Sequence, residues 1–113
     1  MPRVSKISKS PPAAVEDSLK RLGRNIRIAR LRRRLSREEL AERVGLSRYV
    51  LADIEKGKPT TAIAAYLGAL WALGLILDMR EIADPDRDEE GKILERARSP
   101  KTAPKRKTID DDF

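Results

Sequence analysis

LSREELAERVGLSRYVLADIEKG, residues 35–57, carries the start and end signals of two short helices in succession. Ser36 and the glutamate three residues later have the spacing of a capping box, in which each side chain accepts a hydrogen bond from the backbone N–H of the other residue. Gly45 allows a left-handed turn after the first helix, Ser47 caps the second helix, and Gly57 ends it. The stretch predicts two capped helices joined by a tight turn.

Apolar residues line one side of each predicted helix. Leu40 and Val44 share a side of the first, and Ile54 shares the inner side of the second with Val50 or Leu51. A helix, a glycine turn and a second capped helix form a helix-turn-helix, and the second helix of that motif enters the major groove of DNA. The alternative is an ordinary corner between two helices. The charge pattern of the chain favours DNA binding.

Charge is distributed unevenly along the 113 residues, whose net charge is +7. Residues 1–58 hold 16 Lys and Arg against 7 Asp and Glu, residues 59–97 hold 4 against 8, and residues 98–113 hold 5 against 3. A basic first half indicates a surface for a polyanion such as DNA, and the acidic stretch that follows indicates a different role.

The composition also bears on the class of protein. Cysteine and histidine are absent, which removes disulfides, thiolate metal sites and the commonest general base. Carboxylates are plentiful, but no nucleophile–base pair, phosphate loop or metal spacing accompanies them. We therefore expect a protein that is not an enzyme and that has no metal and no cofactor. No long apolar run and no secretory signal is present, so we expect a cytoplasmic protein with no membrane partner.

The composition divides the chain into four segments. We expect a disordered arm over residues 1–14, a helix-turn-helix and dimerisation domain over 15–83, an acidic helical extension over 84–98, and a disordered tail over 99–113. The fold class is therefore all-α. Hydrophobic periodicity and helix-breaking residues predict that the helices around the central motif cover residues 15–34, 60–73, 75–82 and 86–97.

The long helix over residues 15–34 is rich in arginine beyond what solubility needs. Asp17 or Ser18 is expected to start it, and either Arg27 or Arg30 is expected to pair with Glu55 in the second motif helix. The inner side of this helix is expected to consist of Leu19, Leu22, Ile26, Ala29 or Arg30, and Arg33 or Arg34, with Ile28 and Leu31 widening it.

The chain after residue 58 is strongly apolar up to residue 82. Thr60 or Thr61 is expected to cap the next helix, and Ile63, Tyr66, Leu67, Leu70 and Leu73 are expected to form its inner side. Residues 75–82 are more apolar than a small domain can bury, which indicates a partner surface. The predicted homodimer interface consists of Trp71, Leu75, Ile76, Leu77 and Met79.

Residues 19–75 resemble the phage-repressor (Xre) type of helix-turn-helix domain. The resemblance lies in LGRNIRIARLRRRLSREELAERVGLSRYVLADIEKGKP and in the following AYLGALWALGL. It implies a five-helix repressor-like domain, to which this chain adds a short C-terminal helix. Arg37 stands where the family has a glutamine, so a phosphate contact is retained there and an adenine-reading glutamine is not.

Residues 58–101 resemble the HipB-like antitoxins of HipA-type toxin systems. The Pro59 loop, the ALGL turn, the ADP turn, the Asp-x-x-Gly helix start and the Arg-Ser-Pro-Lys end carry this resemblance. It implies a homodimer that binds an inverted-repeat operator on double-stranded DNA, represses its own operon and holds a HipA-like toxin. The alternatives are a free-standing Xre regulator or prophage repressor, and a helical interaction module with no DNA role.

The resemblance and the fold that it implies predict which residues contact DNA. The N-terminal residues of the second motif helix lie nearest the base edges in such a complex, which predicts base contacts from Ser47, Arg48, Tyr49 and Ala52. Arg48 is expected either to read guanine through two hydrogen bonds or to hold a phosphate. The predicted phosphate contacts are Arg34, Arg37, Arg43, Lys56 and Lys58.

Overall fold

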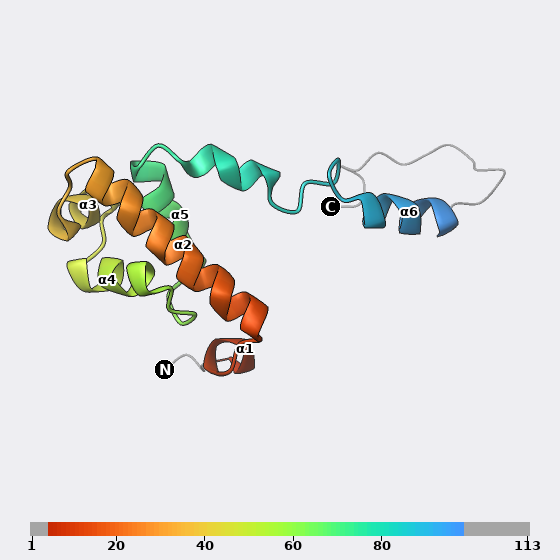
Figure 1. Cartoon of the computed structure of the whole chain (residues 1–113), viewed down its shortest axis with the longest axis horizontal. Helices are drawn as coiled ribbons and strands as arrows, with labels where there is room; N and C mark the ends of the chain where they lie inside the picture. The colour runs from red at the N-terminus through yellow and green to blue at the C-terminus, as the bar shows by residue number, and fades with distance from the viewer. Residues whose placement is uncertain (1–4, 99–113) are drawn as a thin grey trace. The chain divides into compact units, whose positions relative to one another are not determined.

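A computed structural model describes residues 5–98, and every regular element in this part of the chain is helical (Figure 1). The elements are α1 (Lys6–Lys9), α2 (Ala13–Arg32), α3 (Arg37–Val44), α4 (Arg48–Lys56), α5 (Ile63–Ala72), the 3₁₀-helix η1 (Ile76–Glu81) and α6 (Glu89–Arg98). The predicted all-α class is confirmed. Within residues 5–98, the structure contains no helix with the length and apolar character that crossing a bilayer requires.

The two central helices begin and end where their cap residues predict. Ser36 Oγ accepts from the Glu39 N–H at 3.0 Å, and the Glu39 carboxylate accepts from the Ser36 N–H at 2.9 Å. Ser47 Oγ accepts from the Val50 N–H at 3.2 Å. Gly45 and Gly57 have φ angles of 81° and 72°. This left-handed region is open to glycine and costly for residues with a Cβ, so local chemistry favours these helix ends.

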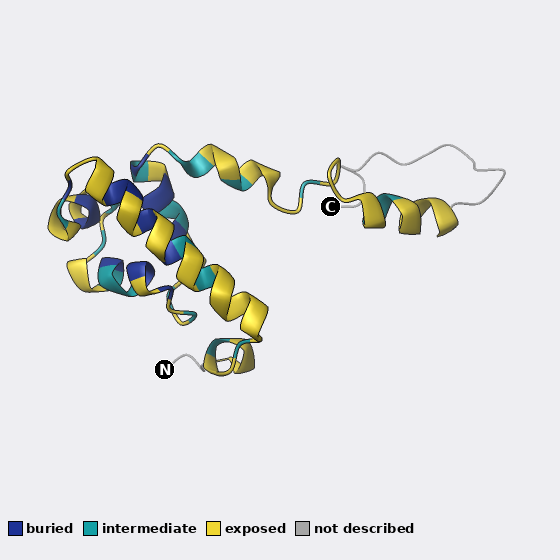
Figure 2. Cartoon of the chain, viewed as in Figure 1, coloured by how far each residue is buried: buried dark blue, intermediate teal, exposed yellow. Residues whose placement is uncertain are grey.

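The core forms where α2, α4 and the α3–α5 pair pack together (Figure 2). Ile26, Leu40, Leu51 and Ile54 have fully buried side chains, as their spacing predicted, and Tyr66, Ala69, Leu70 and Leu73 close the core from α5 and its end. Gly23 lies at the crossing of α2 and α4, where an added Cβ would collide with the backbone carbonyls of Ile54 and Glu55. The absence of a side chain there allows the two helices to approach closely.

The N-terminal segment is more ordered than predicted. Residues 5–14 of the expected disordered arm include α1 and the start of α2, while residues 1–4 lie outside the described part. Ser5 Oγ accepts from the Ser8 N–H at 3.3 Å, and the Ser8 hydroxyl donates to the Pro59 carbonyl at 3.4 Å. The prediction missed this because serine-rich, basic composition is typical of disorder, whereas here serine caps a helical turn.

α2 also differs from its predicted bounds. It begins at Ala13, before the expected caps Asp17 and Ser18, because two alanines after Pro12 favour the helix. It ends at Arg32, and Arg34 then takes a left-handed φ of 54° that turns the chain toward α3. Ile28 and Leu31, expected on the inner side, are exposed.

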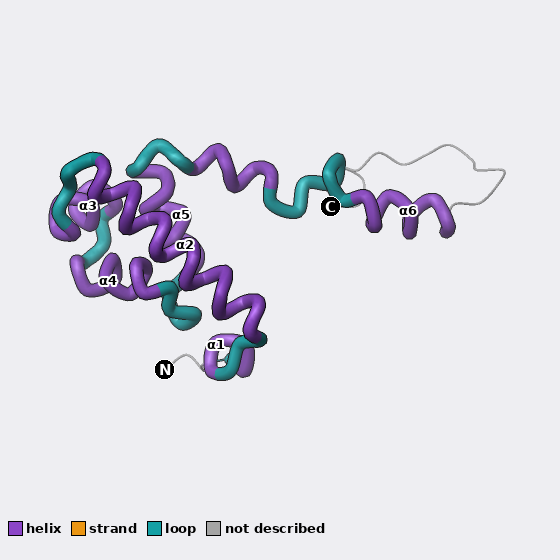
Figure 3. The backbone as a smooth tube through the Cα atoms, viewed as in Figure 1, coloured by secondary structure: helices purple, strands orange, loops and turns teal. Residues whose placement is uncertain are grey.

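The apolar stretch after residue 58 differs from its prediction in three ways. α5 begins after Ala62 without a side-chain cap, so neither Thr60 nor Thr61 has the predicted role. Ile63, expected on the inner side, is 67 % exposed, because Ala65 and Ala69 form the buried side instead. The stretch 75–82 forms the 3₁₀-helix η1 and not an α-helix, and a loop separates η1 from α5 (Figure 3). No residue of η1 is buried, so tertiary packing does not extend it into an α-helix.

The chain divides into two units at Asp78 and Met79, earlier than the predicted boundary at residue 83. The second unit contains α6, which matches the acidic helix predicted over residues 86–97. Asp88 Oδ1 accepts from the Gly91 N–H at 2.9 Å and caps this helix. None of the described residues 79–98 is buried. The predicted disordered tail over residues 99–113 lies outside the described residues.

Candidate nucleic-acid interface

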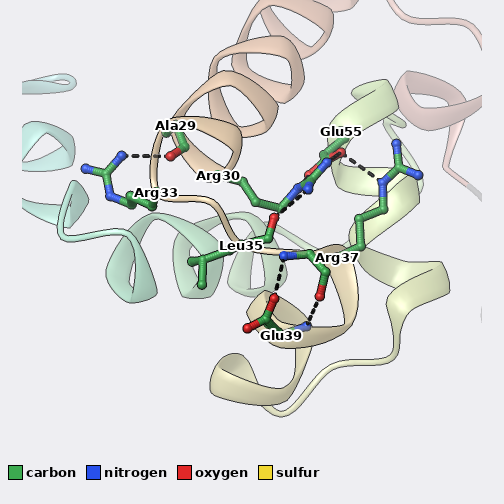
Figure 4. A network of polar contacts seen from close by, with 8 residues as sticks. Ala29, Arg30, Arg33, Leu35, Arg37, Glu39 and Glu55 are labelled. Atoms are coloured by element: carbon green, nitrogen blue, oxygen red, sulfur yellow. Dashed lines mark hydrogen bonds and ion pairs between the residues drawn. The ribbon is translucent and has the colours of Figure 1, made fainter.

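A buried ion pair joins the end of α2 to α4 (Figure 4). Arg30 Nε donates to Glu55 Oε2 at 2.6 Å, and Arg30 Nη2 donates to Glu55 Oε1 at 3.1 Å. Arg30 is only 6 % exposed and Glu55 only 9 %. The two parallel hydrogen bonds form the fork geometry that arginine favours with carboxylates. Arg30, and not Arg27, is therefore the structural partner of Glu55.

Two further contacts extend this pair into a network. Arg30 Nη1 donates to the Leu35 carbonyl at 2.8 Å, and Arg37 Nε donates to Glu55 Oε1 at 3.0 Å (Figure 4). Leu35 lies in the loop between α2 and α3, and Arg37 is the first residue of α3. The Glu55 carboxylate of α4 thus holds the end of α2 and the start of α3, and Arg30 holds the loop between them. Every buried side-chain nitrogen and oxygen of the described residues has a hydrogen-bond partner.

The network holds α4 in place while the N-terminal side of α4 faces outward. Arg48 is exposed and Tyr49 is 68 % exposed, whereas Ala52 is half-buried on the same side. Ser47 is exposed, but its oxygen already accepts the Val50 N–H as the cap of α4. Of the four predicted base-contacting residues, Ser47 therefore caps the helix, and the side chains of Arg48, Tyr49 and Ala52 do not. Arg48 and Tyr49 have the most exposed and the longest side chains among them.

Arg48 is held by neighbours on several sides. Its Nη1 donates to Glu38 Oε1 at 3.4 Å, its Nη2 donates to the Tyr49 hydroxyl at 3.0 Å, and its guanidinium carbon lies 5.0 Å from the centroid of the Tyr49 ring. The Tyr49 hydrogen bond and then Glu38 raise the pKa of Arg48 above its ordinary value. The backbone N–H of Glu38 itself and then Arg48 lower the pKa of the Glu38 carboxyl. Both groups are therefore charged at neutral pH.

A hollow of about 320 Å³ lies between the starts of α3 and α4. Its lining combines charge with apolar surface and consists of Arg37, Glu38, Arg48, Tyr49 and Ala52. Sequence reasoning placed Arg37, Arg48, Tyr49 and Ala52 at DNA but missed Glu38. An acidic residue in the first turn of a helix is common, and only the folded chain brings it beside a residue ten positions away.

The predicted phosphate contacts lie in α3, in α4 and in the loops on either side of the motif. Arg34, Arg43, Lys56 and Lys58 are exposed, and Arg37 retains 45 % of its side-chain exposure although it contacts Glu55. Lys58 Nζ lies 3.3 Å from Asp53 Oδ1, so Asp53 contacts a lysine of the following loop. The structure brings these cations to the motif and its two flanking loops, which leaves their individual roles at DNA as predictions.

A buried tyrosine orders the loop after α4, a role that sequence reasoning missed. The Tyr66 hydroxyl donates to the Lys58 carbonyl at 2.8 Å, and burial raises the pKa of Tyr66 to about 12. The phenol is therefore a donor at every physiological pH. Sequence reasoning placed Tyr66 in the core, and no periodicity signals the carbonyl that its hydroxyl reaches. The bond fixes the backbone that carries Lys58.

The predicted dimer residues are incompletely buried in the single chain. Trp71 is 63 % exposed, which excludes a core role, and Leu77 is exposed as well. Leu75, Ile76 and Met79 are half-buried. Met79 belongs to the second unit, whereas the other four belong to the first.

Comparison with known proteins supports the motif. A family model described as a helix-turn-helix domain matches residues 21–81, which is more than half of the chain. The match extends from within α2 through η1 and includes the whole Arg30–Glu55 network and the outward side of α4. Comparisons with curated proteins and with solved structures gave no match. The chain belongs to the helix-turn-helix domain family, a DNA-binding fold of which α3 and α4 form the motif.

Proposed function

We propose that the protein is a sequence-specific transcriptional repressor that binds an inverted-repeat operator as a homodimer. One observation supports this most strongly. The buried Arg30–Glu55 pair and Arg37 hold α4 rigidly, while the N-terminal end of α4 presents Arg48 and Tyr49 outward. A rigid helix with exposed polar residues at its N-terminal end is what reading a major groove requires.

Contacts divide between base edges and phosphates in this proposal. Arg48 supplies two donors to guanine O6 and N7, which is worth roughly 1–3 kcal/mol of discrimination against another base. Arg34, Arg37, Arg43, Lys56 and Lys58 contact phosphates and supply affinity without sequence information. Tyr49 and Ala52 add apolar contacts at the base edges, and Ser47 contacts a base edge beside them.

The apolar residues that the single chain leaves exposed or only half-buried support the homodimer. A dimer joined through Trp71, Leu75, Ile76, Leu77 and Met79 would cover that surface. To fit adjacent half-sites, its two copies of α4 must lie about 34–36 Å apart, one turn of DNA. The resemblance over residues 58–101 extends the proposal to an antitoxin that represses its own operon and neutralises a HipA-like kinase toxin. The second candidate is a free-standing regulator without a toxin partner. In either case the protein is not an enzyme, needs no cofactor and acts in the cytoplasm.

The central experiment selects bound duplexes from a randomised pool and then measures affinity for every single-base variant of the selected site. Arg48→Ala should lose affinity mainly at one base pair in each half-site. Arg43→Ala should lose affinity evenly across all sequences and reduce the slope of log K against log salt by about 0.9. Arg43 is a better phosphate control than Arg37, because Arg37 also contacts Glu55. Identical profiles for the two variants would contradict the assigned roles.

Two measurements test the partners. Analytical ultracentrifugation should give a dimer for the wild type and a monomer for Trp71→Glu, which places a charge on the apolar surface. Co-purification from the native host should yield a kinase-like protein encoded beside this chain. Recovery of a dimer that binds its operator without any such protein would favour the free-standing regulator.

A further inference from the structure

Glu38 is an acidic residue on the side of the domain that the proposed function turns toward DNA. It precedes Glu39 in the first turn of α3, and Glu39 alone forms the capping box with Ser36. The Glu38 carboxylate instead lies 3.4 Å from Arg48 and lines the same hollow as Arg37, Tyr49 and Ala52. A carboxylate at this position repels phosphates, so it opposes the general affinity that the surrounding arginines supply.

The contacts of Arg48 explain what Glu38 does there. An exposed arginine side chain has many rotamers, and its guanidinium suits phosphate groups as well as base edges. Here Glu38 accepts from Nη1, the Tyr49 hydroxyl accepts from Nη2, and the Tyr49 ring lies beside the guanidinium. These groups confine the guanidinium to the space in front of α4. Within residues 5–98, Glu38 also supplies the one charged contact to Arg48 that comes from a different helix.

We propose that Glu38 is a specificity-determining residue that positions Arg48 to read guanine and keeps it from binding phosphate. This inference rests on the proposed function, because it assumes that α4 enters the groove. Guanine presents two acceptors, O6 and N7, at the major-groove edge, and a guanidinium held in one orientation meets both. A free phosphate group would be repelled from the same space by the Glu38 carboxylate.

The test compares Glu38→Ala with the matched control Glu42→Ala. Glu42 lies one turn further along α3, is exposed and has the same charge, so both variants remove one negative charge from the same helix. Each variant should bind duplex of random sequence more tightly than the wild type. Only Glu38→Ala should reduce the preference for guanine at the base pair read by Arg48, by roughly two- to fivefold, the range expected for losing an exposed ion pair.

Two additional measurements separate positioning from a general effect on folding. Thermal unfolding establishes that both variants are folded at the assay temperature. In an Arg48→Ala background, removal of Glu38 should leave the remaining base preference unchanged, because Arg48 is then absent. A Glu38→Ala variant that keeps the full guanine preference would overturn this inference alone. A wild-type protein without any base preference would overturn the proposed function together with it.

Discussion

Residues 5–78 and residues 79–98 are both helical but are held together in different ways. The first unit has a core of fully buried side chains and a carboxylate that is bound by two arginines inside the protein. The second unit has no buried residue among those described, and its apolar side chains Ile82, Ile93 and Leu94 are exposed. Tertiary packing therefore stabilises the first unit, whereas capping and neighbouring side chains stabilise α6.

The largest expected difference in stability lies between the loss of a buried ion pair in the first unit and the loss of an exposed ion pair in the second. Glu55→Ala leaves the buried Arg30 without its carboxylate and should lower the free energy of unfolding by about 3–5 kcal/mol. Glu81→Ala breaks the exposed contact with Arg87 in the second unit and should change the free energy of unfolding by less than about 1 kcal/mol. Urea unfolding followed by circular dichroism measures both. Equal losses would show that the second unit contributes to the same cooperative structure.

Replacing one glycine in each unit should give effects of different size. Gly23→Ala places a Cβ against the backbone of α4 and should destabilise the protein by about 1–3 kcal/mol. Gly91→Ala displaces the Asp88 carboxylate, which caps α6 through the Gly91 N–H, so the loss of this cap offsets the gain of up to about 1 kcal/mol that alanine brings to a helix over glycine. We therefore expect a lower thermal midpoint for the first variant and little change in helix content for the second. A stabilised Gly23→Ala would argue against the close crossing of α2 and α4.

Removing a helix cap in each unit tests whether capping acts locally or globally. Ser36→Ala removes the hydroxyl that caps α3 and should cost about 1 kcal/mol of the whole protein's stability. Asp88→Ala removes the cap of α6 and should reduce helix content without moving the unfolding midpoint. Far-ultraviolet circular dichroism through a thermal scan distinguishes the two results. A shift of the midpoint by Asp88→Ala would contradict independent units.

The smallest expected effect depends on pH and belongs to the first unit, because residues 79–113 contain no tyrosine. Tyr66→Phe removes the hydrogen bond to the Lys58 carbonyl, which should cost about 1 kcal/mol at neutral pH. Burial raises the pKa of Tyr66 from 10.0 to about 12, so the folded state favours the neutral phenol. This contribution is fully present below pH 10 and is lost as the pH rises through about 12. The stability difference between wild type and Tyr66→Phe should therefore narrow in that range, as unfolding by urea at successive pH values would show.

Local chemistry made the motif predictable from sequence. The ends of α3 and α4 are set by their cap residues, which are Ser36, Gly45, Ser47 and Gly57. Each cap acts through residues close to it in the chain, so the residue types and their spacing are visible in the sequence. The predicted partner of Glu55 is Arg27 or Arg30, and the packing of α2 against α4 selects Arg30.

Features that depend on tertiary geometry were less predictable. Ile28, Leu31 and Ile63 fit an apolar side by periodicity but remain exposed, because the surrounding helices do not cover them. The contact between Glu38 and Arg48 joins two helices across the turn, and the Ser8–Pro59 bond spans 51 positions. No sequence pattern reports the distance between such residues.

The double contact at Glu55 has a consequence for the kinetics of association. Arg30 alone reaches both carboxylate oxygens, so Arg37 can leave Glu55 for a phosphate without exposing an uncompensated charge in the interior. When a duplex binds, we expect only the Arg37 side chain to exchange its acceptor, from Glu55 to a phosphate, while the helices do not move. Encounter with DNA would then be governed by electrostatic steering and its ionic-strength dependence, and not by a slow rearrangement of the protein.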